Sequence, residues 1–271
     1  MLYCKGYTSE YAQVRDYYLV KMYSLFLTLC RCVATLREAF FGAPFGAHFF
    51  IKQKEGMILP STIKESNEVK MIGPEDISSA LDSAALAYEN YPMFNYLVGK
   101  PSKATSIKQI ILSSILSSNI DYIGLSVVDN NKAVAIFIKP NYKGAPALPF
   151  LFKGGLKLIF KHSLGIVFRL LNYENNAMKI KEKYSDNDCW YLYSLTVHPD
   201  YQGKGLASKV MKPMLDFFDM TGQSCYLETN KDCNVPMYEH FGFKLMETGF
   251  IPNTDVVHYA MRRDPIKNKD E

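Results

Sequence analysis

The sequence has few cysteines, and their spacing excludes two classes of stabilised protein. The six cysteines suit neither a disulfide framework nor a zinc site; they are Cys4, Cys30, Cys32, Cys189, Cys225 and Cys233. Two of them, Cys189 and Cys225, lie in apolar stretches typical of strands, where cysteine usually acts as a small buried apolar group. We therefore expect a reducing, cytoplasmic location and no bound metal.

The sequence also lacks a strong net charge and a long uncharged apolar run. The net charge is +4, no five basic residues occur in a row, and no DNA or RNA motif is visible, so we expect no nucleic-acid partner. The apolar segment 17–50 has its longest uncharged core at residues 22–30, which is too short to cross a membrane. With 48% hydrophobic residues, the chain is expected to form a large core without stable membrane insertion.

The sequence does contain a strand, a glycine-containing turn and a helix between Trp190 and Glu228. An alternating apolar run indicates the strand: Tyr191, Tyr193, Leu195 and Val197. After the turn, apolar residues recur at helical spacing from Leu206 to Phe218, and Pro213 lies inside that helix. The free amides at a helix start and the dipole behind them favour an anion such as a pyrophosphate. The alternative is an ordinary strand-to-helix turn that merely needs glycine.

Two common phosphate motifs do not fit this turn. A Walker A loop requires Lys and then Ser or Thr after its last glycine, but Leu206 follows Gly205. A Rossmann turn requires a third glycine or alanine where this chain has Ser208. The turn also comes late, and the residues after Ser208 are too few to build a dinucleotide-binding domain.

A third pattern fits the turn well. The hexapeptide Gln202–Ala207, which has the form Gln-x-x-Gly-x-Ala after Val197-His198-Pro199, resembles the acetyl-CoA-binding turn of the GNAT N-acetyltransferases. The run Tyr226–Thr229 and the segment Asn234–Phe243 resemble the next strand of that family and its N-x-x-x-Y-x-x-x-G-F motif. The combination is most similar to the puromycin N-acetyltransferase-like branch. It is specific between residues 190 and 243 and extends at fold level from about 68 to 263.

The resemblance implies an α/β (α+β) fold, the GNAT acyl-CoA N-acyltransferase fold, with a central mixed, mostly antiparallel sheet flanked by helices. We expect this domain at residues 67–263, followed by a polar tail at 264–271. Residues 1–66 do not resemble the family, and we expect an accessory extension of unknown role. We expect this extension to be helical and to pack on the domain or on another chain, or to be poorly ordered. A further alternative is that translation starts at Met57 or Met71.

The resemblance also implies the site residues. Tyr238 matches the general acid that protonates the leaving thiolate, and Glu228 faces the acceptor amine as base or cation ligand. The cofactor would be held in three ways: by backbone amides of the turn, by strand backbone that pairs with the pantetheine arm, and by Asn234. Asn234 is also expected to cap the short helix that carries Tyr238. The expected cofactor-binding residues are Leu195, Thr196, Val197, Gln202, Gly203, Lys204, Gly205, Leu206, Ala207, Ser208 and Asn234. The alternatives without a catalytic role are that Tyr238 only packs in the core and that Glu228 is an ordinary surface carboxylate.

We therefore expect an N-acetyltransferase that transfers an acetyl group from acetyl-CoA to a primary amine of a small molecule or peptide by direct attack, as a monomer or homodimer. The alternatives are a non-catalytic acyl-CoA-binding or sensing module, and an interaction protein that binds through residues 1–66. Acceptor specificity is expected from Tyr91–Leu97, Asn141–Tyr184 and Ile251–Asp255. Residues 94–97 are expected as an aromatic turn, and 151–184 as helices, broken near 162–165, that cover the sheet or lie on a membrane surface.

Overall fold

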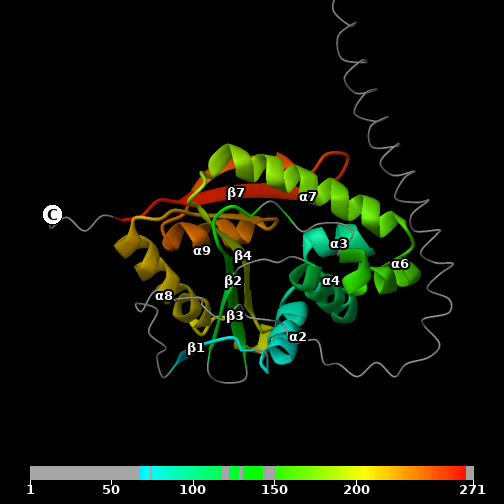
Figure 1. Ribbon diagram of the computed structural model, residues 1–271, viewed down its shortest axis with the longest axis horizontal. Helices are drawn as coiled ribbons and strands as arrows, with labels where there is room; N and C mark the ends of the chain where they lie inside the picture. Colours follow the sequence, from blue (N-terminus) through cyan, green and yellow to red (C-terminus); the bar gives the residue numbers. More distant parts are fainter. Residues whose placement is uncertain are drawn as a thin grey trace, which may run out of the picture. The chain divides into compact units, whose positions relative to one another are not determined.

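The computed structural model describes residues 68–266, with gaps at 74, 118–121, 128–130, 143 and 145–149. Its seven strands form one sheet in the order β1-β2-β3-β4-β5-β7-β6, and only the β4–β5 pair is parallel. The strands are β1 (Val69–Met71), β2 (Tyr122–Val127), β3 (Ala133–Ile138), β4 (Trp190–Val197), β5 (Cys225–Thr229), β6 (Lys244–Phe250) and β7 (Val257–Arg263). The expected mixed, mostly antiparallel sheet with flanking helices is confirmed (Figure 1).

Helices and short helical turns flank this sheet. The helices are α2 (Ile77–Ala87), α3 (Pro92–Val98), α4 (Ala104–Ser117), α6 (Leu156–His162), α7 (Gly165–Tyr184), α8 (Leu206–Thr221) and α9 (Val235–His240). The short turns are η1 (Leu151–Gly155), η2 (Pro199–Tyr201) and η3 (Asp232–Asn234). The expected extension at residues 1–66 lies outside the described residues, as does most of the polar tail.

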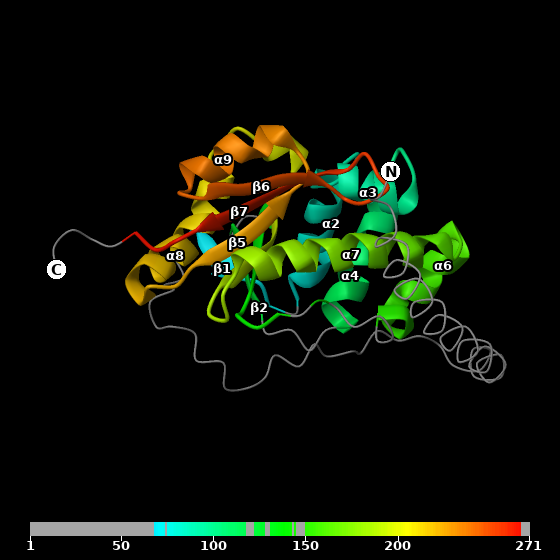
Figure 2. The ribbon, with the colours of Figure 1, turned by 90° about the horizontal axis from the view of Figure 1, so that it is seen from above.

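Two apolar clusters hold the helices in place. In the first, the apolar face of α8 packs on the sheet, with Met211, Met214 and Phe218 against Phe137 and Trp190. The second joins α2, α3, α4, α6 and the start of α7. Helix α7 contacts β5 and β7, so the expected cover of the sheet is confirmed for this helix (Figure 2). Helix α6 instead packs on α4, α7 and η1.

The strands β4 and β5 are paired at one end only. Their register comprises just Trp190 with Cys225 and Tyr191 with Tyr226. Beyond Tyr191 no described strand pairs with the edge of β4 that faces β5, while β5 stays paired with β7 along its whole length. The sheet therefore divides in its middle into two arms with a gap between them.

A β-bulge in β4 sets which side chains face this gap. Leu192 pairs with Phe137 and Ser194 with Ile136, so Tyr193 is an extra residue in the β4–β3 ladder. The expected alternation of one apolar face along β4 is therefore wrong. Tyr191 and Tyr193 face the α4 and α7 side, whereas Leu195 and Val197 pack with α8 on the opposite side.

Residues 94–97 form part of helix α3 and are not the expected aromatic turn. Pro92 occupies the first turn of α3, where its fixed φ suits a helix start and its missing N–H has no intrahelical partner to lose. Gly99 then ends the helix with φ +90°. As a result, Phe94 and Leu97 are buried against α2 and α4 rather than exposed in a loop.

Candidate active site

The free edge of β4 offers backbone groups to a ligand. His198 N donates to Lys132 O at 2.7 Å, so the peptide groups of His198 point towards β3. Because successive residues of a strand point their peptide groups to opposite sides, those of Val197 and Leu195 face the gap. Thr196 points towards β3, so its backbone is not available in the way the sequence suggested. Gln202 Nε2 already donates to Val197 O at 3.2 Å and marks the outer end of this edge.

The glycine-containing turn lies between this edge and helix α8. Gly203 and Gly205 have φ +74° and +71°, a backbone region that other residues rarely adopt, and nothing lies within 4 Å of either position where a Cβ would stand. Helix α8 begins at Leu206, so the amides of Leu206, Ala207 and Ser208 have no partner within the helix. Free amides and a helix dipole in this arrangement favour a negatively charged group, so binding of an anion at the turn stays a prediction.

The two lysines of the turn are already engaged. Lys204 Nζ donates to Asp200 O at 3.0 Å and lies 4.5 Å from the centre of the Tyr201 ring. Lys209 Nζ forms an ion pair with Glu68 at 2.8 Å. The structure thus leaves backbone amides, rather than lysine charges, as the main feature of the turn.

Tyr238 lies on α9 and is buried, with its ring edge-to-face against Phe243. Its hydroxyl makes no hydrogen bond to any described residue. Burial raises the pKa of Tyr238 well above its ordinary value, and the neighbouring Tyr88 and Tyr91 raise it further. The phenol therefore keeps its proton at neutral pH and has it free to donate. Its role as the acid stays a prediction.

Asn234 does not act as the expected helix cap. It stands at the N-cap position of α9, but its backbone is already helical and its side chain accepts no hydrogen bond from the helix. Instead, Asn234 Nδ2 donates to Thr229 Oγ1 at 2.9 Å, at the end of β5. Tyr91 also reaches this end, with its hydroxyl 2.9 Å from Thr229 Oγ1 and 2.8 Å from Asn230 N. Asn234 therefore fixes the end of β5 next to the gap.

Glu228 faces the gap from β5 rather than bulk solvent. Its Oε1 accepts a hydrogen bond from the Tyr191 hydroxyl at 2.5 Å, and the Tyr226 hydroxyl also interacts with this carboxylate. Desolvation raises the pKa of Glu228 to about 7, against the lowering effect of the Tyr191 hydrogen bond. The sequence alternative of an ordinary surface carboxylate does not fit these surroundings.

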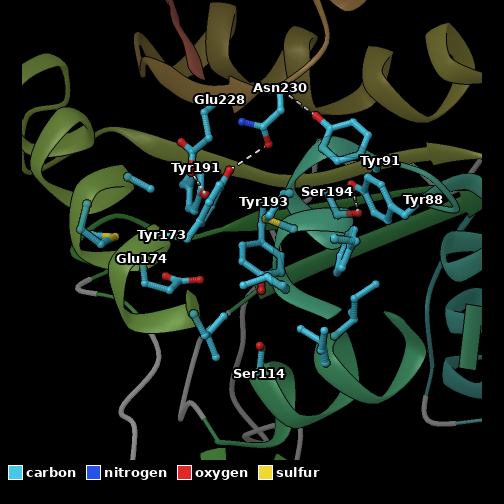
Figure 3. Close-up of a pocket in the computed structure, with 18 residues that line it drawn as sticks. Tyr88, Tyr91, Ser114, Tyr173, Glu174, Tyr191, Tyr193, Ser194, Glu228 and Asn230 are labelled. Atoms are coloured by element: carbon cyan, nitrogen blue, oxygen red, sulfur yellow. Dashed lines mark hydrogen bonds between the residues drawn. The ribbon is translucent and has the colours of Figure 1, made fainter. Parts of the chain in front are cut away.

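A pocket of about 90 Å³ opens beside Glu228 (Figure 3). Strand β4 contributes Tyr191, Tyr193 and Ser194, and helices α2, α3, α4 and α7 close the other sides. Its polar groups are mostly tyrosine hydroxyls and two carboxylates; the labelled residues are Tyr88, Tyr91, Ser114, Tyr173, Glu174, Tyr191, Tyr193, Ser194, Glu228 and Asn230. Tyr238 does not line the pocket. Tyr88 and Tyr91 do line it, and both are close enough to Tyr238 to raise its pKa.

Glu174 lines this pocket and belongs to the segment 141–184 from which acceptor specificity was expected, but the sequence did not single it out. It projects from α7 into the pocket (Figure 3), and it makes no hydrogen bond or ion pair with the described residues. Desolvation raises the pKa of Glu174 to about 7. One signal was available, since Glu174 is the first acidic residue after Asp129 and follows a long apolar and basic stretch. The described residues contain no group of three or more His, Cys, Asp or Glu side chains that could hold a metal ion.

Comparisons with known proteins match the central part of the chain. Residues 169–243 match the model of the acetyltransferase (GNAT) family. An uncharacterised N-acetyltransferase of Schizosaccharomyces pombe is 34% identical over 94 residues, which are 34% of this chain and 37% of the yeast protein. The aligned part thus spans little more than a third of that relative.

Solved structures of two acetyltransferases are similar to this chain at low sequence identity. A histone acetyltransferase HPA2-related protein of Corynebacterium glutamicum has a TM-score of 0.48 at 16% identity, covering 74% of this chain and 98% of its own. Arylalkylamine N-acetyltransferase 2 of Aedes aegypti has a TM-score of 0.49 at 14% identity, covering 72% and 97%. The sequence match at residues 169–243, and not these structural likenesses, supports a relation to the GNAT acetyltransferases.

Proposed function

We propose that this protein is an N-acetyltransferase that transfers the acetyl group of acetyl-CoA to a primary amine of a small molecule or peptide by direct attack. The observation that carries the proposal is the unpaired edge of β4, which runs between an anion-binding turn at one end and a pocket with a desolvated carboxylate at the other. A cofactor with a pyrophosphate, an extended amide-containing arm and a terminal thioester matches that order of features.

The proposed steps assign one task to each group. Amides from Gly203 to Ser208 bind the pyrophosphate, and the free edge at Leu195 and Val197 pairs with the pantetheine amides. A backbone amide of that edge polarises the thioester carbonyl. Glu228 takes a proton from the ammonium ion and passes it to solvent, and the neutral nitrogen then forms a bond to the carbonyl carbon and loses its second proton by the same route. When the C–S bond breaks, Tyr238 gives its proton to the departing thiolate, and solvent reprotonates the phenol.

The two carboxylates favour an acceptor that arrives as an ammonium ion. Glu174 and Glu228 line one aromatic pocket, and neither forms an ion pair with a described residue. Lys181 lowers the pKa of Glu228 through its charge, but its Nζ donates to Tyr142 O at 3.4 Å and lies 5.9 Å from the centre of the Tyr191 ring. A cationic amine would satisfy both carboxylates among tyrosine rings. The Leu227-Glu228-Thr229 run further supports the puromycin N-acetyltransferase-like branch.

The proposed setting is a reducing compartment such as the cytoplasm, with the chain acting as a monomer or homodimer. Cys189 and Cys225 are buried free thiols, and Cys233 is an exposed free thiol. An exposed free thiol suits a compartment in which thiols stay reduced.

The experiment that tests the function is a panel of amines and peptides with acetyl-CoA, with free thiol release as the readout. Acetylation of an amine in the panel, confirmed by the mass of the product, supports the transferase. Saturable acetyl-CoA binding without turnover on any acceptor would instead favour the acyl-CoA-binding or sensing module.

Replacing Gly205 by Val should weaken acetyl-CoA binding at least tenfold, because a side chain there obstructs the approach of a phosphate to the backbone. The positive φ of Gly205 also means that a residue other than glycine there costs about 1–2 kcal/mol or more of stability. Gly222→Val is the matched control, because Gly222 ends the same helix with φ +71° and also has open space around it. Calorimetry and melting curves should show similar destabilisation but a loss of affinity for Gly205→Val alone.

Replacing Glu174 by Gln should raise the KM for a cationic amine on the order of tenfold, with a small change in kcat. Gln keeps the shape but removes the charge that a buried ammonium would contact, and charged hydrogen bonds contribute about 1.5–3 kcal/mol. Glu182→Gln is the control, because Glu182 is on the same helix but exposed. Equal KM values for the two variants in steady-state kinetics would remove Glu174 from the acceptor site.

A further inference from the structure

Two long stretches of the sequence contain no acidic residue. Residues 90–120 and 130–173 hold no Asp or Glu, yet they contain ten cations: Lys100, Lys103, Lys108, Lys132, Lys139, Lys143, Lys153, Lys157, Lys161 and Arg169. Since the whole chain carries a net charge of only +4, the remainder of the chain is net acidic. The positive charge is therefore concentrated rather than spread evenly.

The fold brings much of both stretches to one end of the described domain. Helices α3, α4 and α6 lie there together, with the start of α7 beside them (Figures 1 and 2). Helix α4 contacts both η1 and α6, which links the two acid-free stretches directly. The sheet and α8 lie away from this end.

This end also exposes large apolar side chains. Phe160 on α6 is 86% exposed, although Leu158 two residues earlier is 2% exposed in the core. Phe152, Leu164 and Phe168 are 53%, 46% and 46% exposed. Together with the exposed Lys157 and Lys161, these four residues form a continuous stretch of η1, α6 and the first turn of α7, which we call the α6 patch.

The charged groups packed around the α6 patch are almost all basic. Lys161 Nζ donates to the Thr105 hydroxyl at 3.2 Å, and Arg169 Nε donates to Leu97 O at 2.8 Å. Among the described residues of α4, Lys108 meets an acid, Asp82 of α2, at 2.5 Å. Lys157 and Lys161 form no ion pair with a described residue, and α4, α6 and the part of α7 before Glu174 contain no acidic residue.

We propose that the α6 patch docks on the surface of an anionic lipid bilayer. Exposed phenylalanines and a leucine flanked by lysines match the interfacial mode, in which apolar side chains enter the headgroup boundary and cations meet anionic headgroups. No helix in the described part of the chain is long and apolar enough to span a bilayer.

Two other occupants fit less well. A nucleic acid would use the lysines but leaves the four apolar side chains without a role, because phosphate contacts dominate such binding. In a symmetric dimer formed through this patch, the patch would face its own copy. The charges brought together would then all be positive and would repel each other. An anionic bilayer would contact both the exposed apolar side chains and the lysines of the patch.

The site of docking is close to the proposed acceptor pocket along α7. Phe168 precedes Glu174 by six residues, which corresponds to about 9 Å of helix rise. Leu170 and Tyr173, in between, already line the pocket. Docking would thus hold the pocket near the interface, where amphipathic amines concentrate.

The test is sedimentation of the full chain with vesicles of phosphatidylcholine alone or with about a third phosphatidylserine. We expect binding to the anionic vesicles, weakened at least about tenfold both by Lys157→Glu with Lys161→Glu and by Phe160→Ser with Phe168→Ser. The matched controls are Lys179→Glu with Lys244→Glu, and Phe250→Ser, which change exposed residues elsewhere. The controls should bind like the unaltered chain.

Several results would overturn the proposal. Binding that persists in both patch variants would place membrane attachment elsewhere in the chain, and absence of binding to anionic vesicles would exclude the bilayer altogether. A dimer in lipid-free solution that Phe160→Ser with Phe168→Ser dissociates would identify a second copy as the occupant. Binding to polyuridylate that only the lysine variant weakens, without vesicle binding, would favour nucleic acid. Because none of these readouts involves acetyl transfer, they are independent of the proposed function.

Discussion

Replacing Tyr238 by Phe is expected to lower kcat by about 10²- to 10⁴-fold, the usual effect of losing a general acid. The ring and its contact with Phe243 remain, and the lost hydroxyl has no hydrogen-bond partner among the described residues. Acetyl-CoA affinity and melting temperature should therefore change little. Stopped-flow and steady-state kinetics of thiol release, with calorimetry of acetyl-CoA binding, measure both sides of this expectation.

The rate loss in Tyr238→Phe should shrink under conditions in which the leaving group needs less help. The pKa of a free thiol is about 8.5, so the loss should be smaller at high pH or with a donor whose thiol is more acidic. Tyr122→Phe is a suitable control, because Tyr122 is a partly buried tyrosine on β2 that does not line the pocket. Nearly full kcat in Tyr238→Phe at neutral pH would make Tyr238 a packing residue. A collapse of stability would reveal a structural role for its hydroxyl instead.

Replacing Glu228 by Gln is expected to lower kcat/KM by about 10²- to 10⁴-fold at neutral pH, because the amine loses the base that accepts its proton. Glutamine retains an oxygen that can accept the hydrogen bond of the Tyr191 hydroxyl. In the unaltered protein, kcat/KM should rise with pH through about 7, as the carboxyl of Glu228 loses its proton. A pH profile of the variant should show a smaller rise, because only Glu174 of the two pocket carboxyls then titrates in this range. If the rise persists unchanged, another group titrates.

The same carboxyl should also affect stability in a direction opposite to that of most acidic residues. The pKa of Glu228 is about 7 in the folded protein and its ordinary value is 4.5, so between these values the folded state binds the proton and the unfolded chain does not. Stability should therefore fall as pH rises through this range. Glu228→Gln should flatten that fall in melting curves taken between pH 5 and 8. An unchanged slope would mean that Glu228 titrates normally.

The parts of the site that follow from local sequence could be predicted, and those that depend on how segments meet could not. The turn at Gly203 and Gly205 and the strand and helix around it follow from spacing and glycine content. Glu228 was found through its motif, but its desolvation depends on α7, which is distant in sequence. Glu174 belongs to no motif and reaches the pocket only because α7 packs against the sheet.

Two local errors have physical causes. The bulge at Tyr193 inserts one residue in the β4–β3 ladder, and no pattern of apolar residues in β4 alone marks where a partner strand skips a position. Asn234 has the residue type of a helix cap, yet tertiary structure directs its amide to Thr229. In both cases the choice is made by a neighbouring strand and not by the residue itself.

The single-ended pairing of β4 and β5 also bears on how the domain resists unfolding. The sheet is mechanically two sub-sheets, β1 to β4 and β5 to β7, and only two residue pairs join them directly. At the unpaired end of β5, the Tyr91 hydroxyl contacts Thr229 and the Tyr173 hydroxyl donates to Asn230. These side-chain hydrogen bonds connect β5 to the helical layer, where strand pairing with β4 is absent. A ligand lying in the gap would supply the missing strand and connect the two halves. Binding of that ligand would then also make the sheet more rigid, so the domain should be least rigid when the site is empty.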